Sequence, residues 1–425
     1  MLNIILALFV FQPIEVHDYD LENGLKVLIY EDHFAPVVTT QVHYRVGSAY
    51  EPSGLTGISH MLEHMAFKGT KKYGPREYDR LIEAAGGTIN AFTSLNRTVY
   101  YAHLRSDRYE LELDIEADRM QNLVIAADEF APEKAVVMEE RRLRDNDPYY
   151  SLYEQLNLTS FLYSPYRNPS IGFMADIERF TRDDVLAWYK KYYNPTNAIV
   201  VVAGDVDPVE ALRLVKKHYG TIKGRGAEKL TFYEPPQRGE RRFELEKNVM
   251  TPVLGIHYHT VDIHHRDFHV LEVISMILSY GLSSRFEKGL VRERGVATTI
   301  TTYHSALQYG GSFIVLAMTQ SGISVDSLEG EILREVERLK REPVSDRELD
   351  KAKNQALALS IYEQDSPAGI GLSIGWWEIE SGAWENMNRY PEEIQKVTAD
   401  DVMAAAQKYF TRDNRTVGHL LPEEE

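Results

Sequence analysis

The alternation of apolar and polar residues predicts an ordered series of strands and helices in the first half of the chain. Short apolar or alternating runs, typical of strands, occur at 25–30, 37–46, 88–93, 98–104 and 198–203. Helical periodicity occurs at 57–68, 75–85, 106–124, 131–145 and 183–192. Because the strands come in runs with hairpin spacing, we expect the α+β class, with a mostly antiparallel sheet and helices packed on one face.

The second half of the chain repeats the first. The segment 181–187, TRDDVLA, matches 398–404, TADDVMA, and Lys191-Tyr192 matches Lys408-Tyr409. The same shift of 217 positions, as from 181 to 398, relates Lys134-Ala135 to Lys351-Ala352. A constant shift over so long a span predicts two homologous halves with the same outline of strands and helices.

The composition between the repeats predicts where the halves meet. Glycines and prolines with charged neighbours at 223–242 are typical of a linker, so we predict domains at 14–222 and 243–425. The apolar run at 2–11 is too short to span a bilayer and lacks a basic start. We interpret residues 1–13 as the remnant of an export signal, with a core strand as the alternative. This interpretation predicts a periplasmic or exported protein without a transmembrane anchor; a cytoplasmic protein is the alternative.

Charge and cysteine content exclude several kinds of site. The net charge of -17 argues against nucleic acid as a partner. The chain has no cysteine, which excludes disulfides and thiolate metal sites. Any metal ion must therefore be bound by His, Asp or Glu.

One five-residue motif points to metal chemistry. His60 and His64 are spaced i, i+4, so on a helix both imidazoles lie on one face and can bind one ion. Glu63 lies beside them, where it can accept a proton from a water molecule activated by that ion. H-x-x-E-H is the inverted form of the H-E-x-x-H zinc motif. The alternative is a pair of surface histidines next to an ordinary glutamate.

A catalytic zinc site usually has three protein ligands, so a third one is needed. Glu133, Glu139 and Glu140 lie on a helix that we predict to begin after Pro132. Glu133 and Glu140 are two turns apart on one face, and Glu139 points about 100° away. The spacing does not choose between Glu139 and the face of Glu133 and Glu140.

Four segments together resemble the inverzincin, or pitrilysin-like, family of zinc metallopeptidases, which includes the mitochondrial processing peptidase and related bacterial enzymes. They are HMLEHMAFKGT at 60–70, GTINAFTS at 87–94, EKAVVMEE at 133–140 and SPYRNP at 164–169. The resemblance covers almost the whole chain. It implies that Glu140 is the third ligand of one Zn²⁺ per chain and that Glu133 orients a ligand histidine. The alternative for Glu133 is an acid at a helix N-terminus, favoured by the helix dipole.

The resemblance also implies a function. Family members hydrolyse peptides or unfolded segments by a water molecule that zinc activates and a general-base glutamate, here Glu63. The substrate would pair as an added strand with an edge strand that matches Asn90, Ala91, Phe92 and Thr93. The alternative is that these four residues form an ordinary paired hairpin strand.

The second half departs from the family in two ways. At the repeat shift, the four zinc-site positions correspond to Ile277, Tyr280, Gly281 and Leu357, none of which suits zinc. Many family members also bring an Arg and, seven residues later, a Tyr from this half. Here those positions are Val291 and Thr298; Arg292 could replace the Arg after a shift of one residue, but the Tyr is missing.

We therefore predict that the chain is the metal-bearing subunit of a heterodimer and that a partner subunit supplies the pair; a homodimer is the alternative. A different class of function is a non-catalytic assembly or core subunit of the same fold. We interpret the cluster of histidines in the second half as surface or edge residues: His257, His259, His264, His265 and His269. Trp376-Trp377 is expected in the core or between the halves.

Overall fold

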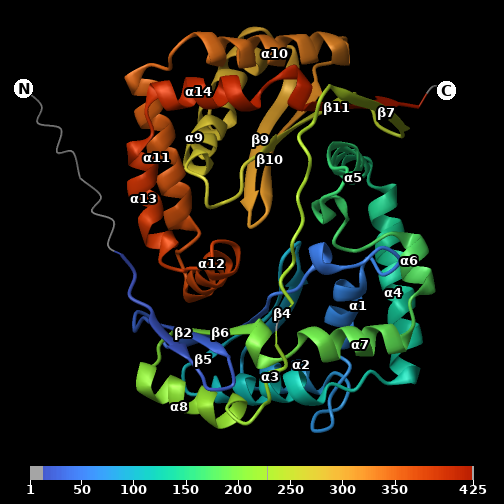
Figure 1. Cartoon of the computed structure of the whole chain (residues 1–425), viewed down its shortest axis with the longest axis vertical. Coiled ribbons are helices and arrows are strands. Elements are labelled where there is room, and N and C mark those ends of the chain that lie inside the picture. The colour runs from blue at the N-terminus through green and yellow to red at the C-terminus, as the bar shows by residue number, and fades with distance from the viewer. Residues whose placement is uncertain (1–12, 227, 424–425) are drawn as a thin grey trace, which may run out of the picture.

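The computed structural model describes residues 13–226 and 228–423, which form two sheets surrounded by helices (Figure 1). The first sheet contains β1 (His17–Asp20), β2 (Lys26–Glu31), β3 (Val37–Tyr44), β4 (Thr88–Thr93), β5 (Thr98–Arg105) and β6 (Ala198–Gly204). The second contains β7 (Arg241–Lys247), β8 (Val253–Thr260), β9 (Ala297–Leu307), β10 (Gly310–Thr319) and β11 (Arg415–Pro422). Their strand orders are β1-β2-β6-β3-β5-β4 and β7-β11-β8-β10-β9.

The two sheets have the same topology apart from β1, which pairs antiparallel with β2 at one edge of the first sheet. In each, one parallel pair, β2 with β6 or β7 with β11, is followed by antiparallel neighbours only. The repeated heptapeptide also has one structure: Thr181 and Thr398 each form a capping box that begins α7 (Arg182–Tyr192) or α14 (Ala399–Tyr409). The predicted α+β fold of two homologous halves, each a mostly antiparallel sheet, is confirmed, and the domain boundaries stay a prediction.

Each half has its own set of helices. The first half has α1 (Ile58–Met65), α2 (Glu77–Ala84), α3 (Glu110–Asn122), α4 (Ala127–Asn146), α5 (Pro148–Ser160), α6 (Met174–Arg179), α7 and α8 (Pro208–Tyr219). The second half has α9 (Asp267–Ser279), α10 (Val325–Arg341), α11 (Asp346–Tyr362), α12 (Pro367–Glu380), α13 (Asn386–Lys396) and α14.

The halves exchange one helix each across their interface. Helix α5 of the first half packs on β7, β8 and β11, and its counterpart α12 packs on β2, β3 and β6 (Figure 1). The approach is close, because a Cβ added at Gly375 of α12 would lie 2.2 Å from the ring of His43 on β3. Each sheet is therefore covered on its own side by its own helices and on the other side by a helix of the other half. Because helices cover both faces of the first sheet, its strand β6 is buried along its whole length and is continuously apolar.

The prediction that His257 is a surface or edge residue is wrong, because a helix of the other half covers it. Its side chain is fully buried under α5, beside the ring of Phe161, and its Nε2 lies 2.8 Å from Ser312 Oγ. The alternation along β8 predicted the strand correctly. It did not predict the burial of His257, because α5, the helix that covers this face of β8, comes from the other half.

Helix α4 begins earlier than predicted. It starts at Ala127, so Pro132 lies in its second turn instead of before its first. Proline lacks an N–H and removes one backbone hydrogen bond there, but the buried side chain of Phe130 anchors the preceding turn in the first core. Glu133 is therefore inside the helix.

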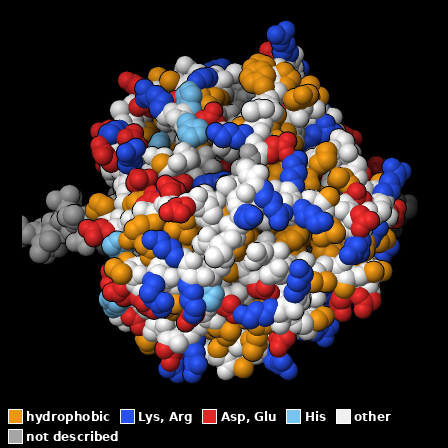
Figure 2. Space-filling view, turned by 60° about the horizontal axis from the view of Figure 1, so that its bottom comes forward, with side chains coloured by type: hydrophobic (Ala, Val, Ile, Leu, Met, Phe, Trp, Pro, Cys, Tyr) orange, Lys and Arg blue, Asp and Glu red, His pale blue; other side chains and the backbone are white. Residues whose placement is uncertain are grey.

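Charged side chains of both signs are mixed on one face of the molecule (Figure 2). On the face shown in Figure 2, Lys and Arg side chains lie among Asp and Glu side chains. Within 13–226 and 228–423, no helix combines the length and the apolar character needed to cross a membrane. Of the segment interpreted as an export signal, residues 1–12 lie outside the described part of the chain.

Candidate metal centre

The helix that carries the motif is fixed at its N-terminus by a buried carboxylate. Glu51 accepts hydrogen bonds from the backbone N–H groups of Gly57 (2.7 Å) and Ser59 (2.8 Å). Burial raises the pKa of Glu51 to about 7, although these hydrogen bonds favour its ionised form. Two donors that a helix start leaves free are thereby satisfied. Because Met61, Leu62 and Met65 face the core, α1 turns its other side, with His60, Glu63 and His64, toward α4 and β4.

Three ligand atoms converge between α1 and α4. Glu140 Oε2 lies 3.8 Å from His60 Nε2 and 3.5 Å from His64 Nε2, and the imidazole rings are 4.7 Å apart. All three atoms lie within 4.8 Å of one another. The neighbouring Glu139 points to solvent and pairs with Arg142 at 3.0 Å. The phase of α4 thus brings Glu140, and not Glu139, to the histidines.

Glu133 binds the ring nitrogen of His64 that is not directed at Glu140. Its Oε1 accepts a hydrogen bond from His64 Nδ1 at 2.8 Å, and its Oε2 lies 2.5 Å from Lys68 Nζ. Burial works against ionisation of Glu133, but Lys68 and His64 outweigh it and lower its pKa. A proton on Nδ1 leaves Nε2 of His64 with a free lone pair directed toward Glu140. The interpretation of Glu133 as a helix-terminal acid is wrong, because it lies in the second turn and bonds to α1.

Sequence reasoning missed Lys68 and Arg144. Lys68 follows His64 by one turn, and Arg144 follows Glu140 by one turn, so helical spacing could have indicated both. The pKa of His60 falls to about 3, chiefly through burial and further through the nearby charges of His64 and Arg144. His60 is thus held as the neutral imidazole, the form that binds metal ions.

Glu63 faces the end of an edge strand. Thr93 Oγ1 donates a 2.5 Å hydrogen bond to Glu63 Oε2. Burial raises the pKa of Glu63, and the bond from Thr93 partly opposes this rise. Asn90, Ala91, Phe92 and Thr93 belong to β4, which pairs with β5 on one side and is the last strand of its sheet. Among the described residues, the outer edge of β4 is therefore unpaired, and its Thr93 end lies beside Glu63.

The corresponding positions of the second half are built differently. Ile277 is buried in the second core, and Leu357 packs against it. Val291 also contacts that core, whereas Arg292 and Thr298 are exposed near the start of β9. No Arg and Tyr pair at the family spacing is present in this segment.

Another acidic and histidine group of the second half is already neutralised. Asp326, Glu329 and His419 could in principle bind a cation. However, the guanidinium of Arg242 binds both oxygens of Glu329, at 2.9 and 2.5 Å, and His419 Nε2 lies 3.0 Å from the same carboxylate. A metal ion there would have to displace a bidentate ion pair.

The geometry of Glu133 gives a testable expectation. Glu133→Gln removes the charged acceptor of His64 Nδ1–H and the partner of Lys68, so we expect zinc affinity to fall about 10- to 100-fold. A competition titration with a chelator of known affinity measures the change. Asp128→Asn, an exposed acid in the first turn of the same helix, is the matched control. Equal zinc affinity of Glu133→Gln and the unmodified protein would contradict the orienting role.

The amino-acid sequence matches peptidase family models and proteins named zinc proteases. The family model "Insulinase (Peptidase family M16)" matches residues 26–172, and "Peptidase M16 inactive domain" matches residues 179–356. The zinc protease PqqE of Helicobacter pylori is 32% identical over 408 residues, which are 95% of this chain and 92% of that protein. A Bacillus subtilis protein named uncharacterized zinc protease YmxG is 26% identical over 93% of this chain and 96% of its own length.

Solved structures of proteases share the fold of this chain. A protease from Helicobacter pylori superimposes with a TM-score of 0.91 at 31% identity, covering 96% of this chain and 100% of that one. The periplasmic protease PqqL from Escherichia coli shares the fold at 17% identity, with a TM-score of 0.81 over 96% of this chain and 48% of that chain. The described metal-centre residues all fall within the range of the first family model.

Proposed function

Because the chain belongs to peptidase family M16, the insulinase family, we propose that it is a zinc metalloendopeptidase acting on peptides or unfolded polypeptide segments. The observation that carries this proposal is the convergence of His60 Nε2, His64 Nε2 and Glu140 Oε2 beside the carboxylate of Glu63. Relatives named zinc proteases support it.

The donor set fits zinc. Two imidazole nitrogens and one carboxylate oxygen from two helices are a common set for a catalytic zinc site, which keeps a further position open. A bound zinc ion lowers the pKa of a water molecule and polarises the scissile carbonyl. His60, His64 and Glu140 would hold it, and Glu133 would keep His64 in the required tautomer. We propose one zinc ion per chain, because the second half offers no comparable free group among the described residues.

Glu63 is the proposed general base. Its raised pKa suits a carboxylate that must accept a proton from the attacking water and later pass it to the leaving amine. Thr93 donates to one oxygen of Glu63 and so leaves the other oxygen for that proton. The hydroxyl also fixes the distance between the base and the end of β4.

The outer edge of β4 is the proposed substrate site. Asn90, Ala91, Phe92 and Thr93 can offer backbone N–H and C=O groups to an extended peptide, as in strand addition to a sheet edge. Main-chain pairing selects for extended chains more than for side chains, which favours peptides and unfolded segments as substrates. Because Thr93 contacts Glu63, a peptide on this edge passes the general base.

The chain is proposed to be the metal-bearing subunit of a heteromeric enzyme, with a partner subunit supplying the missing Arg and Tyr. Positive and hydrogen-bonding groups at the scissile carbonyl stabilise the transition state, and their absence is costly. A non-catalytic core subunit of the same fold is the competing function. A periplasmic or exported location stays a prediction, with a cytoplasmic one as the alternative.

Zinc analysis and hydrolysis assays with purified protein test these proposals. We expect one zinc ion per chain by elemental analysis, weak hydrolysis of a quenched unfolded peptide by the chain alone, and about 10²-fold more with the co-purified partner. A pull-down from the native cells supplies the partner. Full activity of the chain alone would contradict the partner role, and absence of stoichiometric zinc would favour the non-catalytic function.

A further inference from the structure

Arg144, near the C-terminal end of α4, is partly buried, and its side chain binds no carboxylate and no backbone carbonyl of residues 13–226 and 228–423. The other basic side chains of α4 are engaged: Lys134 with two backbone carbonyls, Arg141 with Glu154 and Asp145, and Arg142 with Glu139. A charge that is partly withdrawn from water without a counter-ion favours the approach of an anion. Arg144 is therefore suited to bind one.

The antiparallel course of α1 and α4 brings Arg144 to the metal centre. Glu133 of α4 bonds to His64 of α1. Glu140, two turns later on α4, lies 3.8 Å from His60, which is one turn earlier on α1. Arg144 follows Glu140 by four residues, so it lies on the same face of α4, about 6 Å farther along the helix axis. Its side chain is thus next in line after the three converging ligand atoms.

The charge of Arg144 acts on two residues of the motif. Burial, the charge of His64 and then the charge of Arg144 lower the pKa of His60. Burial raises the pKa of Glu63, and Arg144 is among the groups that oppose this rise. These are the effects of a positive charge near the ligand atoms. They agree with the position that the helical spacing gives.

The turn between α4 and α5 holds the Arg144 side chain in place. Asp147 caps α5 by accepting hydrogen bonds from the backbone N–H groups of Tyr149 (2.8 Å) and Tyr150 (3.2 Å), and Pro148 is the first residue of that helix. The ring centre of Tyr150 lies 5.5 Å from the guanidinium of Arg144. An aromatic face attracts a cation but leaves its N–H groups free for other acceptors.

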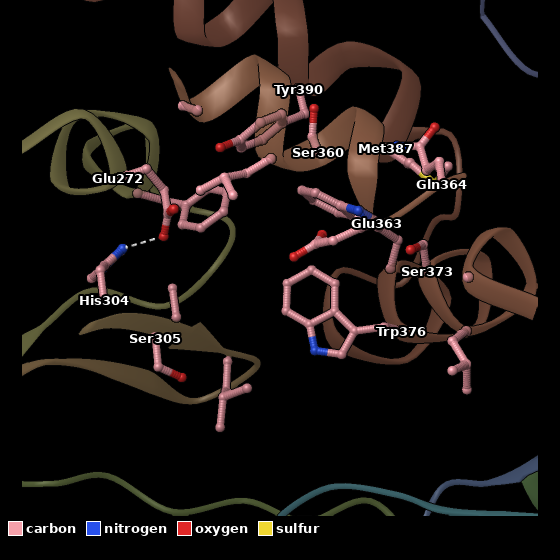
Figure 3. A pocket seen from close by; sticks show the side chains of 18 of the residues that line it. Glu272, His304, Ser305, Ser360, Glu363, Gln364, Ser373, Trp376, Met387 and Tyr390 are labelled. Carbon is pink, nitrogen blue, oxygen red and sulfur yellow. Dashed lines mark hydrogen bonds and ion pairs between the residues drawn. The ribbon is translucent and has the colours of Figure 1, made fainter. Parts of the chain in front are cut away.

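The second half, from which many family members bring an arginine, offers no substitute in its cavity. This cavity of about 540 Å³ is lined by α9, α11, α12 and α13, and Glu272 and Glu363 face it (Figure 3). Within the described part of the chain, Arg97 is the only Lys or Arg that lines it, and it donates to the carbonyl of Leu372 at 3.1 Å. Two carboxylates and an engaged arginine do not stabilise a negative charge.

We propose that Arg144 is a catalytic residue, whose guanidinium binds the carbonyl oxygen of the scissile peptide bond as negative charge develops there. Water attacks the carbonyl carbon, and the π electron pair of the carbonyl moves onto its oxygen. Glu63 takes the proton of the water and gives it to the leaving nitrogen as the C–N bond breaks. A cation beside the oxygen that gains charge stabilises the transition state more than the bound peptide.

This inference rests on the proposed function and adds a role for the first half. Arg144 accounts for the weak hydrolysis expected of the chain alone, and the partner's Arg and Tyr would increase that activity. Tyr150 is a positioning residue, because it acts through the guanidinium.

Arg144→Gln in the zinc-loaded chain without a partner is the first test. We expect kcat/KM for an unfolded peptide to fall about 10²-fold, with the loss in kcat and little change in KM, as when one donor to the developing oxyanion is removed. Arg144→Lys keeps the charge but not the planar fork, and it should recover part of the loss. Arg142→Gln is the matched control on the same helix and should retain the activity, because Arg142 is exposed and pairs with Glu139.

Binding of two uncleavable labelled peptides gives a readout without turnover. One peptide carries a phosphinate in place of the scissile amide, which resembles the anionic tetrahedral transition state, and the other carries an uncharged ethylene group there. By fluorescence anisotropy, Arg144→Gln should weaken binding of the phosphinate peptide about 10²-fold and binding of the ethylene peptide less than about twofold. The zinc affinity, measured by competition with a chelator, should not change.

The outcomes separate the inference from the proposed function. Unaltered kcat/KM, unaltered affinity for the phosphinate peptide, or equal weakening of both peptides would overturn the catalytic role of Arg144. A loss of zinc affinity that explains the loss of activity would also overturn it. Selective loss of phosphinate binding in Arg144→Gln, with no hydrolysis of any peptide by the unmodified protein, would retain the anion-binding role and count against the peptidase function.

Discussion

Glu63→Gln is expected to lower kcat/KM for an unfolded peptide about 10³-fold, while zinc and peptide stay bound. General-base catalysis contributes on this scale, and the amide has no basic oxygen to accept the proton of the attacking water. The substitution keeps the size of the side chain and an acceptor for Thr93 Oγ1, which now donates to Glu63 at 2.5 Å. Steady-state hydrolysis, elemental analysis for zinc and anisotropy of a labelled peptide give the three readouts.

Glu83→Gln makes the same chemical change at an exposed position of α2 and should leave all three readouts unaltered. Retention of most of the activity by Glu63→Gln would mean that another group accepts the proton. Loss of zinc together with activity would instead assign Glu63 to the metal. Either result would overturn the division of roles between Glu63 and the three converging ligand atoms.

The local part of this centre follows from sequence because it depends on helical spacing alone. His60, Glu63 and His64 share one turn of one helix, so a pattern of five residues suffices to place them together. The hairpin of β4 and β5 is local in the same sense. Similarly, the duplication was visible as a constant shift and reappears as two sheets that share the order of five strands.

The non-local part could not be predicted in the same way. The choice between Glu139 and Glu140 depends on how α4 is rotated against α1, and helical spacing within α4 carries no information on that rotation. Pro132 looked like a helix start, but burial of Phe130 in the core extends the helix beyond it. Long-range packing therefore overrode a local signal.

The exchange of α5 and α12 shows the same limit at a larger scale. Each helix packs on a sheet of the other half, so no pattern within its own half reveals its partner. His257 was expected at the surface for this reason and is buried. The exchange also has a structural consequence: Arg97, in the turn after β4, donates to the carbonyl of Leu372 in α12 at 3.1 Å, so this turn is bound to a helix of the second half.

Glu140→Gln and Glu139→Gln form a matched pair that tests the third ligand. Glu140→Gln removes one of three converging ligand atoms, so we expect at least about 10³-fold weaker zinc binding, beyond the 10- to 100-fold cost of losing an outer hydrogen-bond partner. Glu139→Gln should bind zinc normally, because Glu139 points to Arg142 and solvent.

Thermal unfolding gives a second, independent readout of the same pair. A ligand that binds only the folded state at 100 times its Kd adds about 2.7 kcal/mol to the free energy of unfolding. Added zinc should therefore raise the Tm of the unmodified protein and of Glu139→Gln by several degrees, and leave that of Glu140→Gln nearly unchanged. Equal zinc-dependent shifts in both variants would place the third ligand elsewhere, and a shift lost only in Glu139→Gln would mean that α4 rotates when the ion binds.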